Sequence, residues 1–377
     1  MNDMQGGIMR KASIRVAMIA SLLSVGATIC LAQGAGPADP KLQASWAFMQ
    51  KEMPGVPASL LEEACKEGRV MLYHGTWVQA QDAQVKRFQE RFPCVRVEKF
   101  TADTGQRQER WLAEIRANRH VADIVQDTDP GFLDAQSAAG TLLEYKISND
   151  GAFDEAAKRS GYWYASRVAL VGIAWNTDLV SEEEAKKLLR WEGVIDPVWK
   201  GRAAVVDPAA GGVAYLPWYI WLKQYGPEFL QKIGDLKPRV IAAIVPASAS
   251  LASGDIAVLF NASETGLLPL LDRGAPIRWS LPEPGIGPMT GQAIARHAPH
   301  PSAAKLFHEY SFTEEGYGIW QKLGGAPARR NFKDQRPVAQ EKWYKVPASF
   351  APYDRADAST SLQPVMDAYR KLVARAQ

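Results

Sequence analysis

The chain has 377 residues and a formal net charge of +3 at pH 7, with 23% charged and 47% hydrophobic residues. Acidic and basic residues are interspersed, so the charge pattern indicates neither a nucleic-acid groove nor a membrane-binding patch. Without its leader, the chain retains about 345 residues, more than one hydrophobic core usually organises, and we expect two domains.

Residues 1–32 have the order of a secretory signal peptide. Three basic residues between positions 10 and 15 precede an apolar run, Val16–Leu31, which ends at Ala32. No later segment approaches the ~20 apolar residues that a membrane span needs. We therefore predict export to the periplasm and a mature chain that starts near Gln33. Cys30 leaves lipid attachment as the alternative, although the residue before it is not the usual Gly or Ala.

The segment 33–57 is rich in Gly, Pro and Ala around an apolar stretch at 46–49, which predicts a loose leader with one short docked helix. From residue 58 onward, helical and strand patterns alternate. The predicted elements are a helix at about 59–67, strands at 70–73, 95–100 and 122–126, and helices at 78–92 and 106–118.

This alternation predicts parallel strands joined by right-handed crossovers, so the first lobe should be an open α/β sheet. Ligands of such sheets bind beyond the carboxyl ends of the strands. Three loops lie there, at 73–77, 101–105 and 127–130, and two of them place Gly beside hydroxyl side chains. Ordinary turn and cap chemistry uses the same residue types, and it remains the alternative for each loop.

The middle of the chain contains a long apolar strand pattern at 168–175, preceded by Trp163–Arg167. A strand of this kind is buried on both faces or passes between two lobes. Ser181–Glu184 has the capping-box pattern of a helix start. A strand at 203–206 then leads into a Gly-containing turn, 207–212, which opens an aromatic-rich helix.

Two cysteines remain in the mature chain, Cys65 just before the first strand and Cys94 at the start of the second. Adjacent parallel strands would bring both to one end of the sheet, away from the ligand end. In an oxidising compartment we expect a disulfide, which would close a loop of about thirty residues and stabilise the fold by roughly 3 kcal/mol. Two buried free thiols are the alternative.

Several short segments follow one another in a characteristic order between residues 58 and 330. They are Lys66–Gly68, Ile173–Asp178, Asp196–Gly201, Asp207–Pro208, Leu251–Val258, Gln292–Ala295, Pro299–Phe307 and Phe312–Gly316. Together they resemble the extracellular solute-binding proteins of bacterial ABC importers, in the branch that includes ferric-ion binders.

The resemblance implies a two-lobed periplasmic binding protein of type II, with α/β sheets in both lobes and the ligand in the cleft between them. It assigns 58–168 plus 292–335 to the first lobe and 169–291 plus 336–377 to the second. It also implies a monomeric ligand carrier that is not an enzyme, needs no cofactor, and delivers its solute to a membrane permease and its ATPase. A binding protein that serves a chemoreceptor or sensor is the alternative.

Ferric binders of this branch use a His after the first strand and two adjacent tyrosines after a later strand. His74 matches the first position. The predicted strand at 256–260, however, is followed by Asn261–Glu264, which contains no tyrosine. Phenolate oxygens are hard donors suited to a trivalent ion. Iron is therefore the alternative ligand, and no metal site is expected otherwise.

The matching positions instead offer hydroxyls and helix-start amides for an anionic group, carboxylates for an amine, and indoles for an organic body. We predict a small organic anion or zwitterion as ligand, with core packing as the alternative role of each indole. The predicted ligand-binding residues are Thr76, Trp77, Thr104, Asp127, Asp129, Trp163, Trp175, Gly211, Gly212, Asn261, Ser263 and Glu264.

Catalytic patterns are weak. Ser302–Lys305 has the Ser-x-x-Lys spacing of serine β-lactamases, but the partner motifs are missing and helix capping after Pro301 explains it. His297 and His300 lie in a turn without a Cys or carboxylate beside them, which does not support a zinc site. The pattern Asp127–Asp129 fits a capped turn better than a divalent-cation site.

Overall fold

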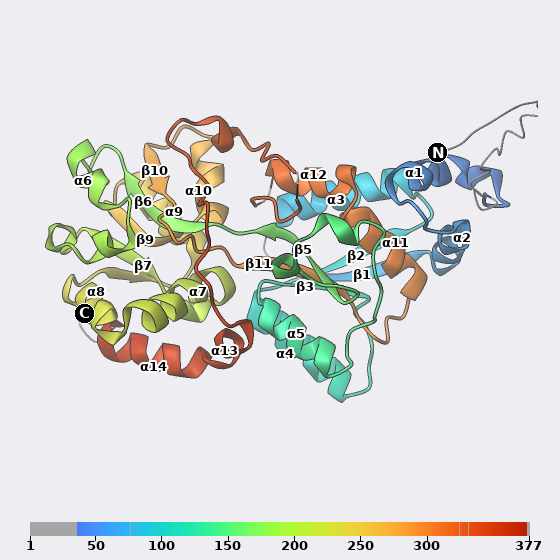
Figure 1. The fold of residues 1–377 in the computed structure, drawn as a ribbon, viewed down its shortest axis with the longest axis horizontal. Coiled ribbons are helices and arrows are strands. Elements are labelled where there is room, and N and C mark those ends of the chain that lie inside the picture. The colour runs from blue at the N-terminus through green and yellow to red at the C-terminus, as the bar shows by residue number, and fades with distance from the viewer. Residues whose placement is uncertain (1–35, 76, 324, 331, 375–377) are drawn as a thin grey trace, which may run out of the picture. The chain divides into compact units, whose positions relative to one another are not determined.

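The structure is a computed structural model that describes residues 36–75, 77–323, 325–330 and 332–374 (Figure 1). The predicted signal peptide and Cys30 lie outside the described residues. Within those ranges, every helix is too short or too polar to cross a membrane.

The first sheet has six strands in the order β2-β1-β3-β11-β5-β4. β1 pairs in parallel with β2 and β3, which confirms the predicted parallel pairing, whereas β11 runs antiparallel to both β3 and β5. The sheet is therefore mixed. Its strands are β1 (Arg69–His74), β2 (Arg96–Thr101), β3 (Ile124–Asp127), β4 (Lys158–Arg159), β5 (Trp163–Val168) and β11 (Met289–Ile294).

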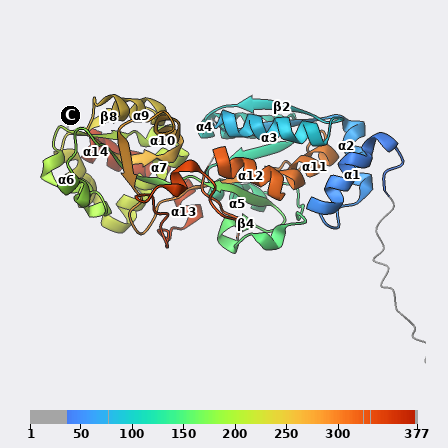
Figure 2. The same ribbon diagram turned by 90° about the horizontal axis from the view of Figure 1, so that it is seen from above.

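Helices cover both faces of the first sheet. Figure 1 shows α3 and α12 on one face and α4 and α5 on the other, and Figure 2 shows α11 and α12 beside α3. The helix that precedes β1 ends at Gly68, which has a φ of 70° in the left-handed region. Many helices end at a glycine in this conformation. The helices of this lobe are α1 (Gln43–Glu52), α2 (Ala58–Glu67), α3 (Val78–Arg91), α4 (Thr104–Arg116), α5 (Pro130–Ala138), α11 (Pro301–Ser311) and α12 (Glu314–Leu323).

The second sheet has five strands in the order β10-β6-β9-β7-β8, with β7 parallel to β8 and β9 and with β6 antiparallel to β9 and β10. The strands are β6 (Val171–Asn176), β7 (Ala203–Val206), β8 (Arg239–Ile241), β9 (Val258–Ser263) and β10 (Ile277–Ser280). The helices around it are α6 (Glu182–Lys187), α7 (Gly212–Ile220), α8 (Pro227–Asp235), α9 (Ile244–Ser253), α10 (Glu264–Leu271), α13 (Arg355–Thr360) and α14 (Leu362–Leu372).

Two predicted strands differ in the structure. The prediction of a single strand at 168–175 is wrong, because the chain passes from one sheet to the other at Ala169 and Leu170. Val168 ends β5 in the first sheet, and Val171 begins β6 in the second. The strand expected at 256–260 extends to Ser263, since Val171 of β6 pairs with Ser263 and prolongs the ladder. The predicted capping box at Ser181 is confirmed. Each sheet with its helices forms one lobe, and β11 returns the chain to the first lobe from Met289.

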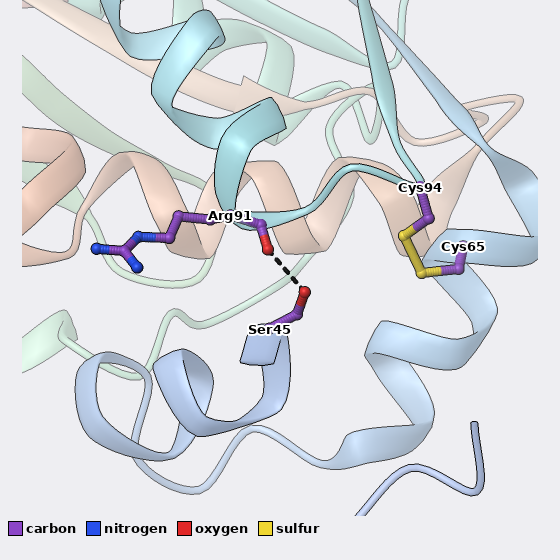
Figure 3. The surroundings of a disulfide bond; sticks show 4 residues. All are labelled: Ser45, Cys65, Arg91 and Cys94. Carbon is purple, nitrogen blue, oxygen red and sulfur yellow. Dashed lines mark hydrogen bonds between the residues drawn. A yellow bond between two sulfur atoms is a disulfide. The ribbon is translucent and has the colours of Figure 1, made fainter. Parts of the chain in front are cut away.

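The segment before α2 packs on the first lobe. Trp46, Phe48 and Met49 of α1 are buried in the same core cluster as Phe92. The Ser45 hydroxyl donates to the carbonyl oxygen of Arg91 at 2.7 Å (Figure 3). Beside this contact, Cys65 of α2 and Cys94, which follows α3, form a disulfide with their Cα atoms 5.0 Å apart. The disulfide ties the helix before β1 to the turn before β2.

Removal of this disulfide should lower the free energy of unfolding, because the loop of 29 residues would then be open in the unfolded state. We expect the double substitution Cys65→Ser and Cys94→Ser to cost about 3 kcal/mol in guanidinium denaturation. Dithiothreitol should bring the wild-type protein to the stability of the variant and leave the variant unchanged. An unfolding free energy that is the same for wild type and variant would contradict the prediction.

Candidate functional site

The carboxyl ends of strands from both sheets meet where the chain crosses between them. β3 and β5 both run antiparallel to β11, so they end at the same edge of the first sheet as β1. Only Ala169 and Leu170 separate β5 from β6, whose first residue, Val171, pairs with Ser263 at the end of β9. We name this region the interlobe edge: the last residues of β5 and the residues that end or follow β1, β3, β7 and β9. Open α/β sheets bind ligands at such ends.

Thr104 and Gly212, both predicted site residues, come together at the interlobe edge with Thr128. The hydroxyl oxygens of Thr104 and Thr128 are hydrogen-bonded at 2.8 Å. A Cβ atom added to Gly212 would lie 2.5 Å from Thr128 Oγ1 and 3.5 Å from Thr104 Oγ1. Gly212 has φ 43°, a conformation that favours glycine. Two first-lobe hydroxyls thus lie against the start of α7 in the second lobe, where backbone N–H groups lack helical partners.

Gly211 and Asn261, two further predicted residues, have polar groups that are already bonded within the protein. The Gly211 N–H donates to the carbonyl oxygen of Pro208 at 2.9 Å, so this amide already has a partner in the structure. Asn261 Nδ2 donates to the carbonyl oxygen of Val206 at 3.0 Å, and Asn261 Oδ1 accepts from the Val206 N–H at 2.8 Å. The Asn261 side chain therefore joins β9 to the end of β7.

Asp127 and Asp129 are buried, and both carboxylates are already hydrogen-bonded within the protein. Burial raises the pKa of Asp127 to about 7, although the Arg107 guanidinium lies 3.7 Å from its Oδ2. Asp127 Oδ1 accepts from the Asp129 N–H at 2.9 Å. Asp129 caps α5 and accepts from the Ser359 hydroxyl at 2.9 Å, and burial raises its pKa as well. The capped-turn alternative accounts for both side chains.

Glu264, predicted to hold an amine, is fully buried at the start of α10. Its Oε1 accepts from the Leu170 N–H at 3.0 Å, and its Oε2 pairs with the Arg336 guanidinium. Burial raises the pKa of Glu264, and the charge of Arg336 opposes that rise. The neighbouring Ser263 caps α10 by accepting from the Thr265 N–H. The Glu264 side chain therefore holds the crossing between the lobes in place, whereas the Ser263 hydroxyl is bonded within α10.

The three predicted tryptophans separate in the structure. Trp77 lies half-buried before α3, with its ring centroid 6.4 Å from that of Trp320 in α12. Trp163 is fully buried, and its Nε1 donates to Asp134 Oδ1 at 2.9 Å. Trp175 lies near the far end of β6 and packs in the core of the second lobe. Of these indoles, the structure brings only Trp77 to the interlobe edge, and core packing describes the other two.

His74 ends β1 at the interlobe edge, whereas Thr76 lies outside the described residues. His74 is 1% exposed, and its Nε2 lies 2.7 Å from Thr101 Oγ1. Burial, together with the charges of Lys99 and Arg107, lowers the pKa of the imidazole to about 4. The ring is therefore neutral at pH 7. In the described part of the chain, no group of three or more His, Cys, Asp or Glu side chains could hold a metal ion.

Arg167 in β5 is a functional candidate that the sequence did not single out. β5 contains one extra residue relative to β11, because Thr290 pairs with Arg167 and the next residue, Gly291, pairs with Ala165. Ser166 is thus left out of the ladder as a bulge. Bulges re-aim the side chains that follow them and are frequent beside functional sites.

The bulge turns Arg167 toward the α3 and α12 face. Strict alternation would place it on the same face as Trp163, which bonds to α5. Instead, Arg167 Cζ lies 4.3 Å from the ring centroid of Trp77 and 5.7 Å from that of Trp320. The only signal in the sequence is an arginine directly before the apolar crossing segment, and neither its burial nor its neighbours follow from that position.

The pKa of His74 gives a testable pH dependence. A lowered folded-state pKa stabilises the fold above the unfolded-state value of 6.5, and this stability is lost as the pH falls toward about 4. We expect an imidazole NMR signal that stays in its neutral form down to about pH 4 and is absent from the variant His74→Gln. The unfolding free energy of the variant should fall less steeply between pH 6.5 and 4 than that of the wild type. Titration of this signal near pH 6.5 would contradict the assignment.

Comparison with known proteins gives a consistent result. The family model of bacterial extracellular solute-binding proteins matches residues 72–324. An uncharacterized protein of Haemophilus influenzae is 26% identical over 209 residues, and the match spans 52% of this chain and 60% of that relative.

Solved structures share the fold. Iron-bound HitA from Pseudomonas aeruginosa superposes with a TM-score of 0.68 at 19% identity, over 81% of this chain and 99% of HitA. The Campylobacter jejuni ferric binding protein gives 0.66 at 14% identity, over 80% and 99%. AfuA from Actinobacillus pleuropneumoniae, with fructose-6-phosphate bound, gives 0.65 at 18% identity, over 81% and 99%. The predicted two-lobed periplasmic-binding-protein fold is confirmed, and since the family model covers more than half of its length, the chain belongs to the family of bacterial extracellular solute-binding proteins.

Proposed function

We propose that the protein captures a small organic anion or zwitterion in the periplasm and delivers it, by closure of its lobes, to the permease and ATPase of an ABC importer. The proposal rests on the family membership and on the signal-peptide pattern of residues 1–32. The protein acts as a monomeric carrier rather than as an enzyme, and it uses no cofactor.

One observation carries the choice of ligand class. Thr104 and Thr128 of the first lobe lie directly against Gly212 at the start of α7 in the second lobe. Hydroxyl donors and a helix N-terminus together favour an anionic group over a cation. An anion bound beside this contact would interact with both lobes at once and would therefore favour their closed arrangement.

Ferric ion is the second candidate, and His74 is the observation that favours it. The neutral imidazole at the interlobe edge is in the protonation state that binds metals. The residues after the strand expected at 256–260 argue against ferric ion. The side chains of Asn261 and Glu264 are already bonded to Val206, Leu170 and Arg336. We therefore place an organic ligand first.

Delivery to a chemoreceptor or sensor would use the same lobe closure. The two roles differ in the protein that recognises the closed form, which is a permease in import and a receptor in sensing. Reconstitution with the candidate permease and ATPase in liposomes separates the two roles, because an importer accumulates labelled solute only when this protein and ATP are both present. Accumulation that is independent of the protein would contradict the importer role.

Substitution of Thr104 tests the ligand contact. In calorimetric titrations against carboxylates, amino acids, phosphonates, sugar phosphates and ferric citrate, the wild-type protein should bind an organic anion or zwitterion and not ferric ion. Thr104→Ala should weaken that binding by about tenfold or more, because a hydrogen bond to a charged group is lost.

Thr141→Ala is the matched control. The Thr141 hydroxyl also bonds within its own lobe, to the Gln136 carbonyl oxygen, but it lies beside Arg296, past the opposite end of β11. We expect unchanged affinity in this variant. Equal effects of the two substitutions on affinity, or submicromolar binding of ferric ion by the wild type, would contradict the proposal.

Gly212→Ala tests lobe closure. The added Cβ would lie 2.5 Å from Thr128 Oγ1 at a φ of 43°, so the two lobes should no longer approach each other as closely. We expect an affinity lower by about tenfold or more, equivalent to about 1.4 kcal/mol, because the clash opposes the closed arrangement that the ligand favours. Small-angle X-ray scattering should show less compaction on ligand addition.

Two further variants check the cause. Gly105→Ala, near the start of α4, adds a Cβ that meets no atom within 4 Å and should behave as wild type. The double variant Gly212→Ala, Thr128→Ala removes the clashing hydroxyl and should recover part of the affinity. Wild-type compaction and affinity in Gly212→Ala would show that this contact does not form in the bound state.

A further inference from the structure

Buried polar atoms without a partner gather at one place in the molecule. Within the described residues, eight buried side-chain nitrogen or oxygen atoms have no hydrogen-bond partner. Five of the eight belong to Arg167, Thr290, Trp320 and Gln321. Burying such groups is unfavourable unless they are bonded, so a cluster of five indicates a missing partner rather than scattered imperfections.

These four residues are neighbours. Thr290 pairs with Arg167 in the ladder between β11 and β5. Gln321 Nε2 donates to the carbonyl oxygen of Ser166 at 3.4 Å, and Trp320 precedes Gln321 in α12. The side chains of the four are at least 94% buried, with exposed fractions of 6% for Arg167, 5% for Thr290, 2% for Trp320 and 0% for Gln321.

Arg167 differs from the other arginines at the interlobe edge. Arg107 lies 3.7 Å from Asp127, and Arg336 pairs with Glu264 and Asp334. Arg167 has no carboxylate within 4.0 Å among the described residues, and its Nε and Nη1 lack partners. Burial lowers its pKa to about 10, so the guanidinium remains charged at pH 7. Glu264 attracts this cation only from a greater distance, and a buried charge without a bonded counter-ion is unfavourable.

The indole of Trp77 covers the face of the guanidinium and leaves its in-plane N–H groups for an acceptor. Most of the unpartnered atoms are donors: Arg167 Nε and Nη1, Trp320 Nε1 and the Thr290 hydroxyl. We propose that these donors bind an oxyanion group of the ligand, a carboxylate, phosphonate or phosphate. This inference rests on the proposed function as a solute-binding protein and adds a second anion contact to the one proposed at Thr104.

Trp77 connects the cluster to space for the rest of the ligand, because its indole contacts Arg167 and also lines a recess. Trp77 and Arg336 line a recess of about 310 Å³ between α3 and α12 of the first lobe and α10 of the second. Apolar side chains of Leu268, Pro269, Leu323 and Pro337 also line it. The ligand therefore presents its oxyanion to Arg167 and packs a compact, partly apolar body on Trp77 and these side chains. The Gln321 Oε1 accepts from an O–H or N–H group near the anionic end.

Titration of the purified protein with succinate, its neutral analogue succinamide, methylphosphonate and inorganic phosphate tests this assignment and separates the possible sources of the oxyanion. We expect at least one oxyanion to bind and succinamide not to bind. Arg167→Lys should weaken binding at least tenfold, because a lysine keeps the charge but not the planar donor set. Trp320→Phe should weaken it about three- to tenfold, since it removes one donor and keeps an aromatic ring.

Trp221→Phe is the matched control, because Trp221 is also fully buried with an unpartnered Nε1, in the core of the second lobe. It should change the melting temperature as Trp320→Phe does and leave affinity unchanged. If Arg167→Lys fails to fold, Trp320→Phe against Trp221→Phe still decides the question.

The outcomes separate the two proposals. If the wild type binds an oxyanion and both Arg167→Lys and Trp320→Phe bind it equally well, only the assignment to this cluster is overturned. The unpartnered atoms of the cluster would then bind water. A wild-type protein that binds no oxyanion overturns both proposals.

Discussion

One buried carboxylate, that of Glu264, joins the segments that meet at the interlobe edge. Its Oε1 accepts from the Leu170 N–H, and the Leu170 carbonyl oxygen accepts from the Glu264 N–H, so the crossing segment is bonded reciprocally to the start of α10. Its Oε2 pairs with Arg336, in a third segment of the chain. A carboxylate is tolerated in such a buried place only when its oxygens are bonded, and the three segments are therefore held in one arrangement.

This arrangement fixes the end of β5 and thereby the place of Arg167, three residues before Leu170. Each neighbouring arginine has a carboxylate beside it, Arg107 that of Asp127 and Arg336 that of Glu264. These pairs build the frame of the edge. The remaining cation lies between aromatic rings in a region of low dielectric, where its interaction with an anion is stronger than in water.

The fold by itself does not decide the ligand. Solved proteins with the same fold include one determined with iron and one determined with fructose-6-phosphate. Their identities to this chain are 19% and 18%, so the shared architecture carries no residue-level information about the cleft. What distinguishes this chain is a set of side chains on a common scaffold, as is usual for folds that serve many functions.

Sequence alone determined the helices and strands between residues 58 and 127, the capping box at Ser181 and the parallel pairing, because periodicity and cap chemistry act over a few residues. It also placed Thr104 in one of three loops that converge at the strand ends. Long-range contacts decided which of the predicted side chains are available to a ligand. The sequence suggests that Asn261 is a free polar residue, but its side chain bonds to Val206, which lies 55 positions earlier. The bulge in β5 appears only once β11 pairs with it, and that pairing turns Arg167 from one face of the sheet to the other. A side chain's face depends on register, and register is a property of two strands rather than one.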